Sequence, residues 1–258
     1  MPRYLGQHFL KDKAKIKQAV SAVNPEDGDF IVEVGPGHGE LTSEILKVPQ
    51  NFRLFAVEKD KKLVSLLQAK FSSENRLEIV EGDILKILPS LIKKSPYKIC
   101  GNIPYYLTGF LFRKIGELAI LPKLVVFTIQ KEVGERLSAE KGNFNLLAAS
   151  IQSWGNPKII SSIPKKSFSP PPQVDSVAVL IEKKEQQLSE TEKLSYFLTA
   201  KAAFKQPRKT LLNNLSAGLK IDKAESLKLI AKIGLLPNSR PQDLNFESLL
   251  KLSLLVNH

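Results

Sequence analysis

A glycine-rich turn between an apolar segment and a helical pattern is the strongest constraint on how this chain folds. Residues 30–34, Phe-Ile-Val-Glu-Val, are typical of a buried strand, and they run directly into Gly35-Pro36-Gly37-His38-Gly39. A helical pattern follows over residues 40–46. Glycine adopts backbone conformations that are closed to other residues and lets the backbone approach a ligand closely. A strand, a glycine turn and a helix in this order predict the opening unit of an α/β sheet.

The spacing of these glycines argues against a dinucleotide. The turn reads G-x-G-x-G, whereas a dinucleotide-binding fold carries G-x-G-x-x-G. A purely structural glycine turn is the alternative. Glu33 lies inside the apolar strand, where a carboxylate is costly to bury unless a partner hydrogen-bonds to it. The amino group of a small ligand is one such partner.

Three further predicted strands each end in a polar residue. The strand at residues 53–57 ends in Glu58, the strand at 77–81 is followed by Asp83, and the strand at 97–100 by Asn102. Glu58 follows the first glycine at about the ~20-residue spacing at which an acidic residue contacts ribose hydroxyls. Ligands of open α/β sheets bind outside the carboxyl ends of the strands. We therefore expect these side chains to line one pocket with the glycine turn, although each of them could instead cap a helix or lie on the surface.

The stretch Asn102-Ile103-Pro104-Tyr105 is suited to holding a planar amine. Pro104 fixes its own φ and restricts Ile103 to extended conformations, so the turn is stiff. The Asn102 side-chain oxygen and the Ile103 carbonyl are both acceptors for an exocyclic amino group. Tyr105 offers a flat face on which a base can stack. An ordinary Asn-x-Pro turn is the alternative.

Composition indicates the kind of partner. The 258 residues suffice for one large α/β domain and a small second one. The 38 Lys and Arg exceed the 26 Asp and Glu, which gives a net charge of +12. Both parts of the chain share this excess, which favours a polyanionic partner, although a generally basic, soluble surface is the competing interpretation.

Cysteine and histidine are too sparse for a disulfide or a metal site. The single cysteine excludes an intrachain disulfide and fits a reducing compartment. Cys100 ends an apolar run, so we expect a buried thiol and no nucleophile. The three histidines indicate no metal site. We find no signal peptide and no apolar run of the ~20 residues that cross a bilayer, so we expect a cytoplasmic protein.

Several stretches, taken together, closely resemble the ribosomal RNA adenine dimethyltransferase family. They lie at residues 6–10, 33–42, 58, 82–83, 102–105, 165–176, 202–211 and 239–244. The resemblance therefore runs from residue 6 to about residue 250. One departure is Pro207, where the family usually shows an arginine. Because proline is tolerated in the first turn of a helix, we expect Pro207 to start a helix and to alter one basic contact.

This resemblance implies a Rossmann-like class I S-adenosylmethionine-dependent methyltransferase domain over residues 1–184, and a small all-helical domain over residues 185–258 that seats the RNA. It implies S-adenosylmethionine as methyl donor and two adjacent adenosines near the 3′ end of small-subunit ribosomal RNA as acceptors. The implied partner is this RNA, within the small ribosomal subunit or its precursor, and we expect a monomer.

The resemblance also implies roles for individual residues. The expected donor contacts are His8, Leu10, Glu33, Gly35, Gly37, Glu58, Asp83, Ile84 and Asn102. The expected acceptor site consists of Asn102, Ile103, Pro104, Tyr105 and Phe168, with the rings of Tyr105 and Phe168 gripping the two faces of the target base. The expected RNA contacts are Lys165, Lys166, Lys205, Arg208 and Lys209.

Three other functions remain possible at this point. A resistance-type methylase of large-subunit RNA shares the glycine turn and the Asn-x-Pro-Tyr stretch, but residues 239–244 argue against it. A nicotinamide dehydrogenase requires a glycine spacing that the chain lacks. A non-catalytic ribosome assembly factor is disfavoured by intact Glu33, Glu58, Asp83 and Asn102.

Overall fold

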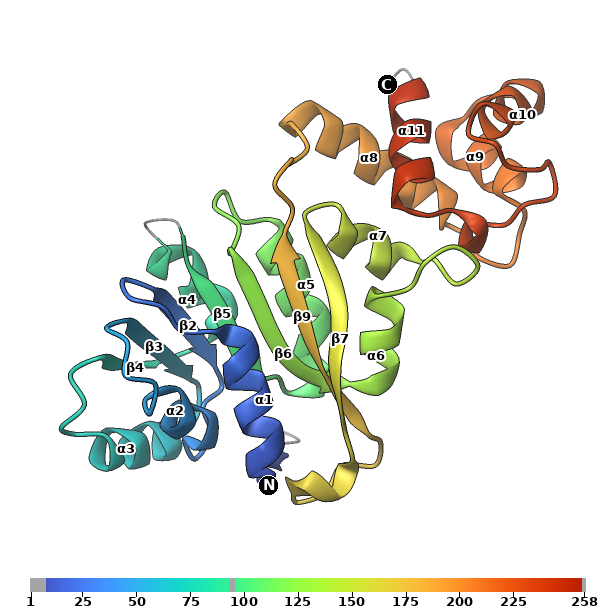
Figure 1. The fold of residues 1–258 in the computed structure, drawn as a ribbon. Helices are drawn as coiled ribbons and strands as arrows, with labels where there is room; N and C mark the ends of the chain where they lie inside the picture. The colour runs from blue at the N-terminus through green and yellow to red at the C-terminus, as the bar shows by residue number, and fades with distance from the viewer. Residues whose placement is uncertain (1–7, 93–95, 257–258) are drawn as a thin grey trace. The chain divides into compact units, whose positions relative to one another are not determined.

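A mixed β-sheet forms the centre of the first part of the molecule. The computed structural model describes residues 8–92 and 96–256. Within them the large sheet has seven strands in the order β4-β3-β2-β5-β6-β9-β7 (Figure 1). The strands are β2 (Phe30–Val34), β3 (Arg53–Glu58), β4 (Leu77–Glu81), β5 (Lys98–Asn102), β6 (Leu124–Gln130), β7 (Gly155–Ile163) and β9 (Ser176–Lys183). The strands β4, β3, β2, β5 and β6 are parallel, and β9 pairs antiparallel with β6.

The strand order reverses between β2 and β5. From β2 the chain continues through β3 and β4 on one side, and then crosses to β5 on the other side. Such a switch point opens a crevice at the carboxyl ends of the strands. The central strands are buried almost throughout, because helices cover both faces of a parallel sheet. This arrangement confirms the expected Rossmann-like α/β fold.

The helices of this part follow the strands alternately. They are α1 (Lys13–Val23), α2 (Glu40–Ile45), α3 (Lys61–Lys70), α4 (Ile84–Leu91), the 3-10 turn η1 (Tyr105–Leu107), α5 (Thr108–Gly116) and α6 (Lys131–Leu137). Figure 1 shows α1 in front of the sheet and α5 behind it. Asp12, Asp60 and Asp83 begin α1, α3 and α4 by accepting hydrogen bonds from backbone N–H groups. These caps satisfy donors that the helix itself leaves unpaired.

Two short strands lie outside the large sheet. The strands β1 (Phe9–Leu10) and β8 (Phe168–Ser169) pair antiparallel with each other. A 3-10 turn, η2 (Lys165–Ser167), leads into β8. The sequence does not predict this pair, since two residues carry no periodicity. The pairing brings the start of the described chain to residues that lie some 160 positions later.

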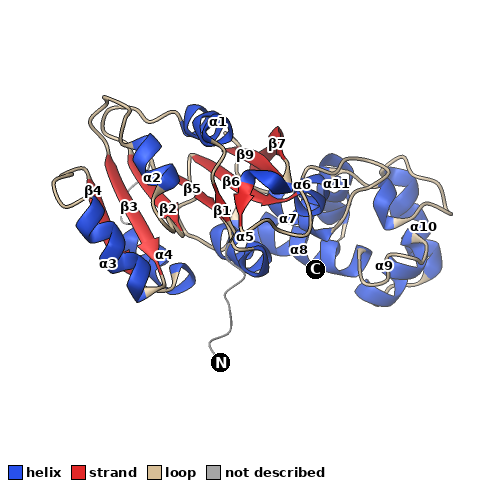
Figure 2. Cartoon of the chain, turned by 90° about the horizontal axis from the view of Figure 1, so that it is seen from below, coloured by secondary structure: helices blue, strands red, loops and turns tan. Residues whose placement is uncertain are grey.

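A second compact unit is helical. It comprises α7 (Leu146–Gln152), α8 (Glu190–Ala203), α9 (Leu211–Leu219), α10 (Lys223–Lys232), the 3-10 turn η3 (Pro241–Asp243) and α11 (Phe246–Leu255), coloured by secondary structure in Figure 2. Its core gathers around the fully buried Tyr196, whose hydroxyl donates to the Ala149 carbonyl at 3.1 Å. Ser189 forms a capping box with Glu192, as its sequence pattern indicates.

Two details of this unit differ from the sequence-based expectation. The contacts group residues 135–155 with residues 184–258, whereas the sequence placed 135–155 in the first domain. Tyr196 and Ala149 illustrate why, because both belong to one core. Pro207 does not start a helix: it lies in the turn before α9, which begins after its cap at Thr210. Residues 1–184 and 185–258 as functional domains stay a prediction.

A buried ion pair joins the amino ends of the two central strands. Lys98, the first residue of β5, contacts Asp29, which precedes β2, at 2.6 Å between Nζ and Oδ2. Their side chains are 3% and 7% exposed. The Lys98 ammonium also donates to the Asn24 carbonyl. The pair therefore fixes, from the opposite end, the two strands whose carboxyl ends form the crevice.

Replacing Asp29 should destabilise the protein strongly. Asp29→Ala removes the closer of the two carboxylates at the Lys98 ammonium, the other being Glu26 at 3.4 Å. We expect the free energy of unfolding to fall by about 2 kcal/mol. Urea unfolding followed by circular dichroism measures this loss. Glu182→Ala is the control, because Glu182 pairs with Lys158 at 3.4 Å on the surface and should cost less than ~1 kcal/mol. Equal losses in the two variants would contradict a stabilising role of the buried Asp29–Lys98 ion pair.

Candidate active site

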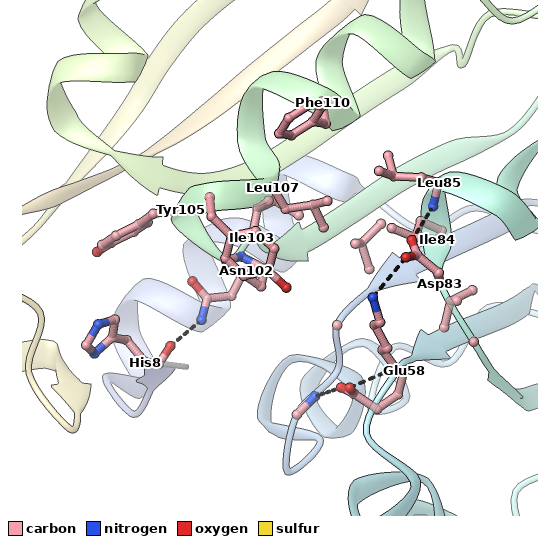
Figure 3. Close-up of a pocket in the computed structure, with 18 of the residues that line it drawn as sticks. His8, Glu58, Asp83, Ile84, Leu85, Asn102, Ile103, Tyr105, Leu107 and Phe110 are labelled. Atoms are coloured by element: carbon pink, nitrogen blue, oxygen red, sulfur yellow. Dashed lines mark hydrogen bonds and ion pairs between the residues drawn. The ribbon is translucent and has the colours of Figure 1, made fainter. Parts of the chain in front are cut away.

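A cavity of about 290 Å³ opens at the carboxyl ends of the central strands (Figure 3). Ten of the residues expected from the sequence line it: His8, Gly35, Gly37, Glu58, Asp83, Ile84, Asn102, Ile103, Pro104 and Tyr105. They come from the turns after β2, β3, β4 and β5 and from the segment before β1. The predicted convergence of four strand ends on one pocket is therefore present in the structure.

The glycine turn brings its backbone to the edge of the cavity. Gly35 and Gly37 have φ angles of +64° and +62°, which only glycine adopts without strain. A Cβ at Gly37 would lie 2.8 Å from the ring of Phe9. The Gly37 N–H donates to Glu58 Oε2 at 3.2 Å. Position 37 must therefore be glycine both for its conformation and for its closeness to the ring.

The Glu58 carboxylate is held by three backbone amides. Besides Gly37, the N–H groups of Lys59 and Asp60 donate to Oε1 at 2.8 and 2.9 Å. Glu58 is 5% exposed. A carboxylate offers about four acceptor positions, so Glu58 keeps one for a ligand. That capacity suits the hydroxyl pair of a ribose.

The Asp83 carboxylate lies at the next strand end. Oδ1 accepts from the Leu85 N–H at 3.0 Å, and Oδ2 pairs with Lys59 Nζ at 3.0 Å (Figure 3). Burial raises the pKa of Asp83, but the hydrogen bonds from Lys59 and Leu85 and the nearby positive charges outweigh burial and lower it. Each oxygen retains a free lone pair, so Asp83 can still accept from an amino group.

The Asn102 amide is oriented by the backbone of His8. Nδ2 donates to the His8 carbonyl at 2.7 Å (Figure 3), and a carbonyl only accepts, which fixes nitrogen and oxygen. No hydrogen bond from the described residues reaches Oδ1. Ile103 N–H donates to the Thr128 carbonyl at 3.0 Å, which ties the turn to β6. The site thus presents a fixed, uncommitted acceptor oxygen.

Tyr105 and His8 form the wall beyond Asn102. Their ring centroids are 5.8 Å apart. The Tyr105 hydroxyl hydrogen-bonds to Ser176 Oγ at 2.8 Å, and His8 Nδ1 lies 2.8 Å from the Pro170 carbonyl oxygen. Burial raises the pKa of Tyr105 above its usual value, which keeps the phenol neutral at physiological pH.

Phe168 does not line the cavity, and its expected contact with the target base stays a prediction. Its side chain is 4% exposed and packs with Leu10, Ile16, Ile163 and Ala178. The β1–β8 pairing holds Phe168 opposite Leu10. Leu10 is buried in the same cluster, although it lines a smaller neighbouring cavity.

Glu33 lies in that smaller cavity, of about 40 Å³, which shares Gly35 and Asn102 with the larger one. It is 1% exposed. Thr42 Oγ1 donates to Glu33 Oε2 at 2.7 Å. The partner that its burial requires is therefore a threonine hydroxyl of α2. Burial raises the pKa of Glu33 to about 7, although the hydrogen bonds from Thr42 lower it.

Several lining residues were missed from the sequence. They are Lys59, Leu85, Tyr106, Leu107 and Phe110. Tyr106 and Phe110 are each 56% exposed, whereas aromatic residues in a helical pattern usually signal core. Tyr106 and Phe110 reach the edge of the cavity because of the turn from η1 into α5, which the sequence pattern does not reveal. The expectation that Cys100 is buried is confirmed. Burial raises the pKa of its thiol well above the usual value.

The expected RNA contacts are exposed in both units. Lys165 and Lys166 lie on η2 in the first unit. Lys205, Arg208 and Lys209 lie in the turn between α8 and α9 in the second unit. Asn214 is 3% exposed, and its amide hydrogen-bonds to the backbone of Gln206, Lys209 and Thr210. Its buried amide therefore gives the basic turn a fixed shape.

Two kinds of feature are absent from the described residues. None of the helices that the structure describes combines the length and apolarity required to cross a bilayer. Over the same residues, His, Cys, Asp and Glu form no group of three or more that could hold a metal ion.

The strand order, the glycine turn and the acidic residues at the following strand ends define a class I S-adenosylmethionine-dependent methyltransferase. The chain belongs to the ribosomal RNA adenine dimethylase family, whose model matches residues 2–257. The resemblance found in the sequence is thereby confirmed.

Individual relatives agree with this assignment. The chain is 38% identical over 253 residues to ribosomal RNA small subunit methyltransferase A of Dehalococcoides mccartyi, covering 97% of this chain and 86% of the relative. It is 33% identical to the protein of the same name from Halothermothrix orenii, covering 96% and 86%.

Solved structures share the fold. A dimethyladenosine transferase from Plasmodium falciparum matches with a TM-score of 0.80 and 25% identity, covering 95% of this chain and 96% of that one. The 23S rRNA methyltransferase ErmE matches with a TM-score of 0.81 and 20% identity, covering 95% and 98%. The second likeness concerns the fold alone.

Glu33 should make stability depend on pH. Its raised pKa means that the folded protein keeps a proton that the unfolded chain releases, so this group's contribution falls as pH rises from about 4.5 to about 7. Glu33→Gln removes that dependence. We expect the variant to gain about 2 kcal/mol relative to the parent protein between pH 5 and pH 8. Urea unfolding at each pH measures the difference, and a constant difference would contradict the burial of an ionisable group.

Proposed function

We propose that this protein transfers methyl groups from S-adenosylmethionine to the N6 amines of two adjacent adenosines, in a hairpin loop near the 3′ end of small-subunit ribosomal RNA, and so contributes to small-subunit biogenesis. The product is N6,N6-dimethyladenosine. The protein acts as a monomer in the cytoplasm, on the small subunit or its precursor. Family membership and the names of the relatives support this substrate.

The observation that carries the proposal is the fixed orientation of Asn102. With Nδ2 committed to the His8 carbonyl, Oδ1 faces an incoming ligand as an acceptor. An adenosine N6 amine has two N–H donors in one plane, and the Asn102 side chain and the Ile103 carbonyl accept them. Hydrogen bonds from N6 to these acceptors direct its lone pair away from the base plane. Positioning of this kind supplies a large part of the rate of a group transfer.

The donor half of the cavity fits the methyl donor. Glu58 retains an acceptor position for the ribose hydroxyls and Asp83 one for the adenine amine, while Ile84, Leu107 and Phe110 offer apolar surface to the base. The glycine turn lets the backbone approach closely. When bound, S-adenosylmethionine supplies a methyl group on a sulfonium, which is a good leaving group.

The acceptor half receives a base that has left its stack. Enzymes that act on a base inside RNA extrude it into a pocket, at a cost of a few kcal/mol that stacking in the pocket offsets. Tyr105 provides one face for this stacking. The ring of His8 lies beside it, with its centroid 5.8 Å from that of Tyr105. The exposed lysines 165 and 166, with Lys205, Arg208 and Lys209, bind RNA phosphates in this proposal.

Labelling tests the function directly. The protein is incubated with methyl-labelled S-adenosylmethionine and, in parallel, unmethylated small subunits, large subunits and free ribosomal RNAs, and the labelled nucleotide is mapped. We expect dimethyladenosine at two adjacent positions in the small-subunit RNA. Label in large-subunit RNA would move the protein to the resistance-type methylases. Tight small-subunit binding without label would favour a non-catalytic assembly factor.

Removing the Asn102 amide should abolish transfer with little effect on binding. Asn102→Ala lacks the oxygen that positions N6, and we expect the turnover rate to fall at least ~100-fold. Filter binding of small-subunit RNA should change little. Asn145→Ala is a control for the loss of an amide elsewhere, since Asn145 caps α7. Undiminished turnover in Asn102→Ala would remove Asn102 from the mechanism.

A further inference from the structure

An ion pair inside the cavity links the two acidic strand ends of the donor half. Lys59 Nζ lies 3.0 Å from Asp83 Oδ2, and both residues line the cavity. The dashed line that reaches Asp83 from the side of Glu58 in Figure 3 marks this pair. Lys59 directly follows Glu58, so one short segment supplies both a carboxylate for ribose and a cation for the neighbouring carboxylate.

Both ends of this ion pair are fixed by the backbone. The Lys59 N–H is held by Glu58 Oε1 at 2.8 Å, at the end of β3. Asp83 is held by its cap to the Leu85 N–H at 3.0 Å, at the start of α4. The strands β3 and β4 are paired in register up to Glu58 and Glu81. The Asp83 carboxylate and the main chain of Lys59 are therefore held close together, and the Lys59 side chain has only to span the gap between them.

A second ion pair, between the start of α3 and the end of β4, serves as a comparison. Lys61 Nζ lies 3.5 Å from Glu81 Oε1, with side chains 84% and 49% exposed. Neither residue lines either cavity described above. The side chains of Lys59 and Asp83 are 61% and 28% exposed. The two lysines thus differ chiefly in whether their carboxylate faces the donor site.

The charge of Asp83 depends on a few neighbours. Lys59 faces it from the end of β3 and Lys86 from α4, and both lower the pKa of Asp83 against the effect of burial. Tyr106, from η1, contributes to the surroundings of Lys59 itself. Without Lys59, burial would be opposed only by Lys86 and the Leu85 N–H.

We propose that Lys59 is a positioning residue of the donor site, whose ammonium keeps Asp83 charged and in place to accept the adenine amine of S-adenosylmethionine. This inference rests on the proposed function. A purine that covers Asp83 excludes water, and the attraction between two charges strengthens as water leaves. The attraction between Lys59 and Asp83 is therefore stronger in the complex than in the free protein. This difference increases the affinity for the donor.

Binding of S-adenosylhomocysteine to the full chain tests this role. Lys59→Met keeps the length of the side chain and loses its charge, and Lys61→Met is the matched control. Calorimetry should give about tenfold weaker binding for Lys59→Met and unchanged binding for Lys61→Met. As the pH is lowered, the affinity of Lys59→Met should fall at a higher pH than that of the parent protein, because Lys59 is the largest contributor to the lowered pKa of Asp83. Lys59→Arg should restore most of the affinity.

A second ligand separates a local role from general damage. S-inosylhomocysteine carries an oxygen where adenine carries its amine, so it lacks the group that Asp83 accepts. The difference between Lys59→Met and the parent protein should shrink to less than ~2-fold with this ligand. Equal affinity of the two proteins for S-adenosylhomocysteine, or the same penalty with both ligands, would overturn the role of Lys59. A parent protein that binds neither ligand would instead refute the proposed function.

Discussion

The carboxylate of Glu58 is the group on which the geometry of the donor half depends. It accepts from Gly37 in the turn after β2, and from Lys59 and Asp60 in the turn after β3. Parallel strands alone bring their carboxyl ends to one edge of the sheet, but they leave the following turns free to differ. A nearly buried carboxylate that joins two turns removes this freedom, since breaking it would leave a charge without its hydrogen bonds.

The acceptor half is built in another way. Its polar atoms come from residues far apart in the chain: Asn102 at the end of β5, His8 before β1, and Ser176 at the start of β9. The short β1–β8 pair holds the segments together, and Ile103 is tied to β6 through Thr128. Donor and acceptor halves meet at Asn102, which lies at the end of the strand next to the switch point.

The difference between these two halves determines which parts of the site could be predicted from the sequence. The glycine turn, Glu58 and Asp83 are predictable because each follows its own strand and the parallel sheet gathers strand ends. The burial of Phe168 could not be predicted, because its environment is set by pairing with Leu10, which lies some 160 positions earlier. The grouping of residues 135–155 with the helical unit escaped prediction for the same reason, since Tyr196, the partner of Ala149, lies some 50 positions later. Lys59 carries no sequence signal of its own, because its partner Asp83 lies 24 positions later in the chain.

The partners of the two best-oriented side chains are main-chain groups. Asn102 donates to the carbonyl of His8, and Glu58 accepts from the amides of three residues. Such bonds do not depend on which side chain stands at positions 8, 59 or 60. Substitutions at these positions can therefore alter affinity or selectivity without changing the orientation of the Asn102 amide and the Glu58 carboxylate. The geometry of these two groups is robust to mutation, while the side chains around them are free to vary.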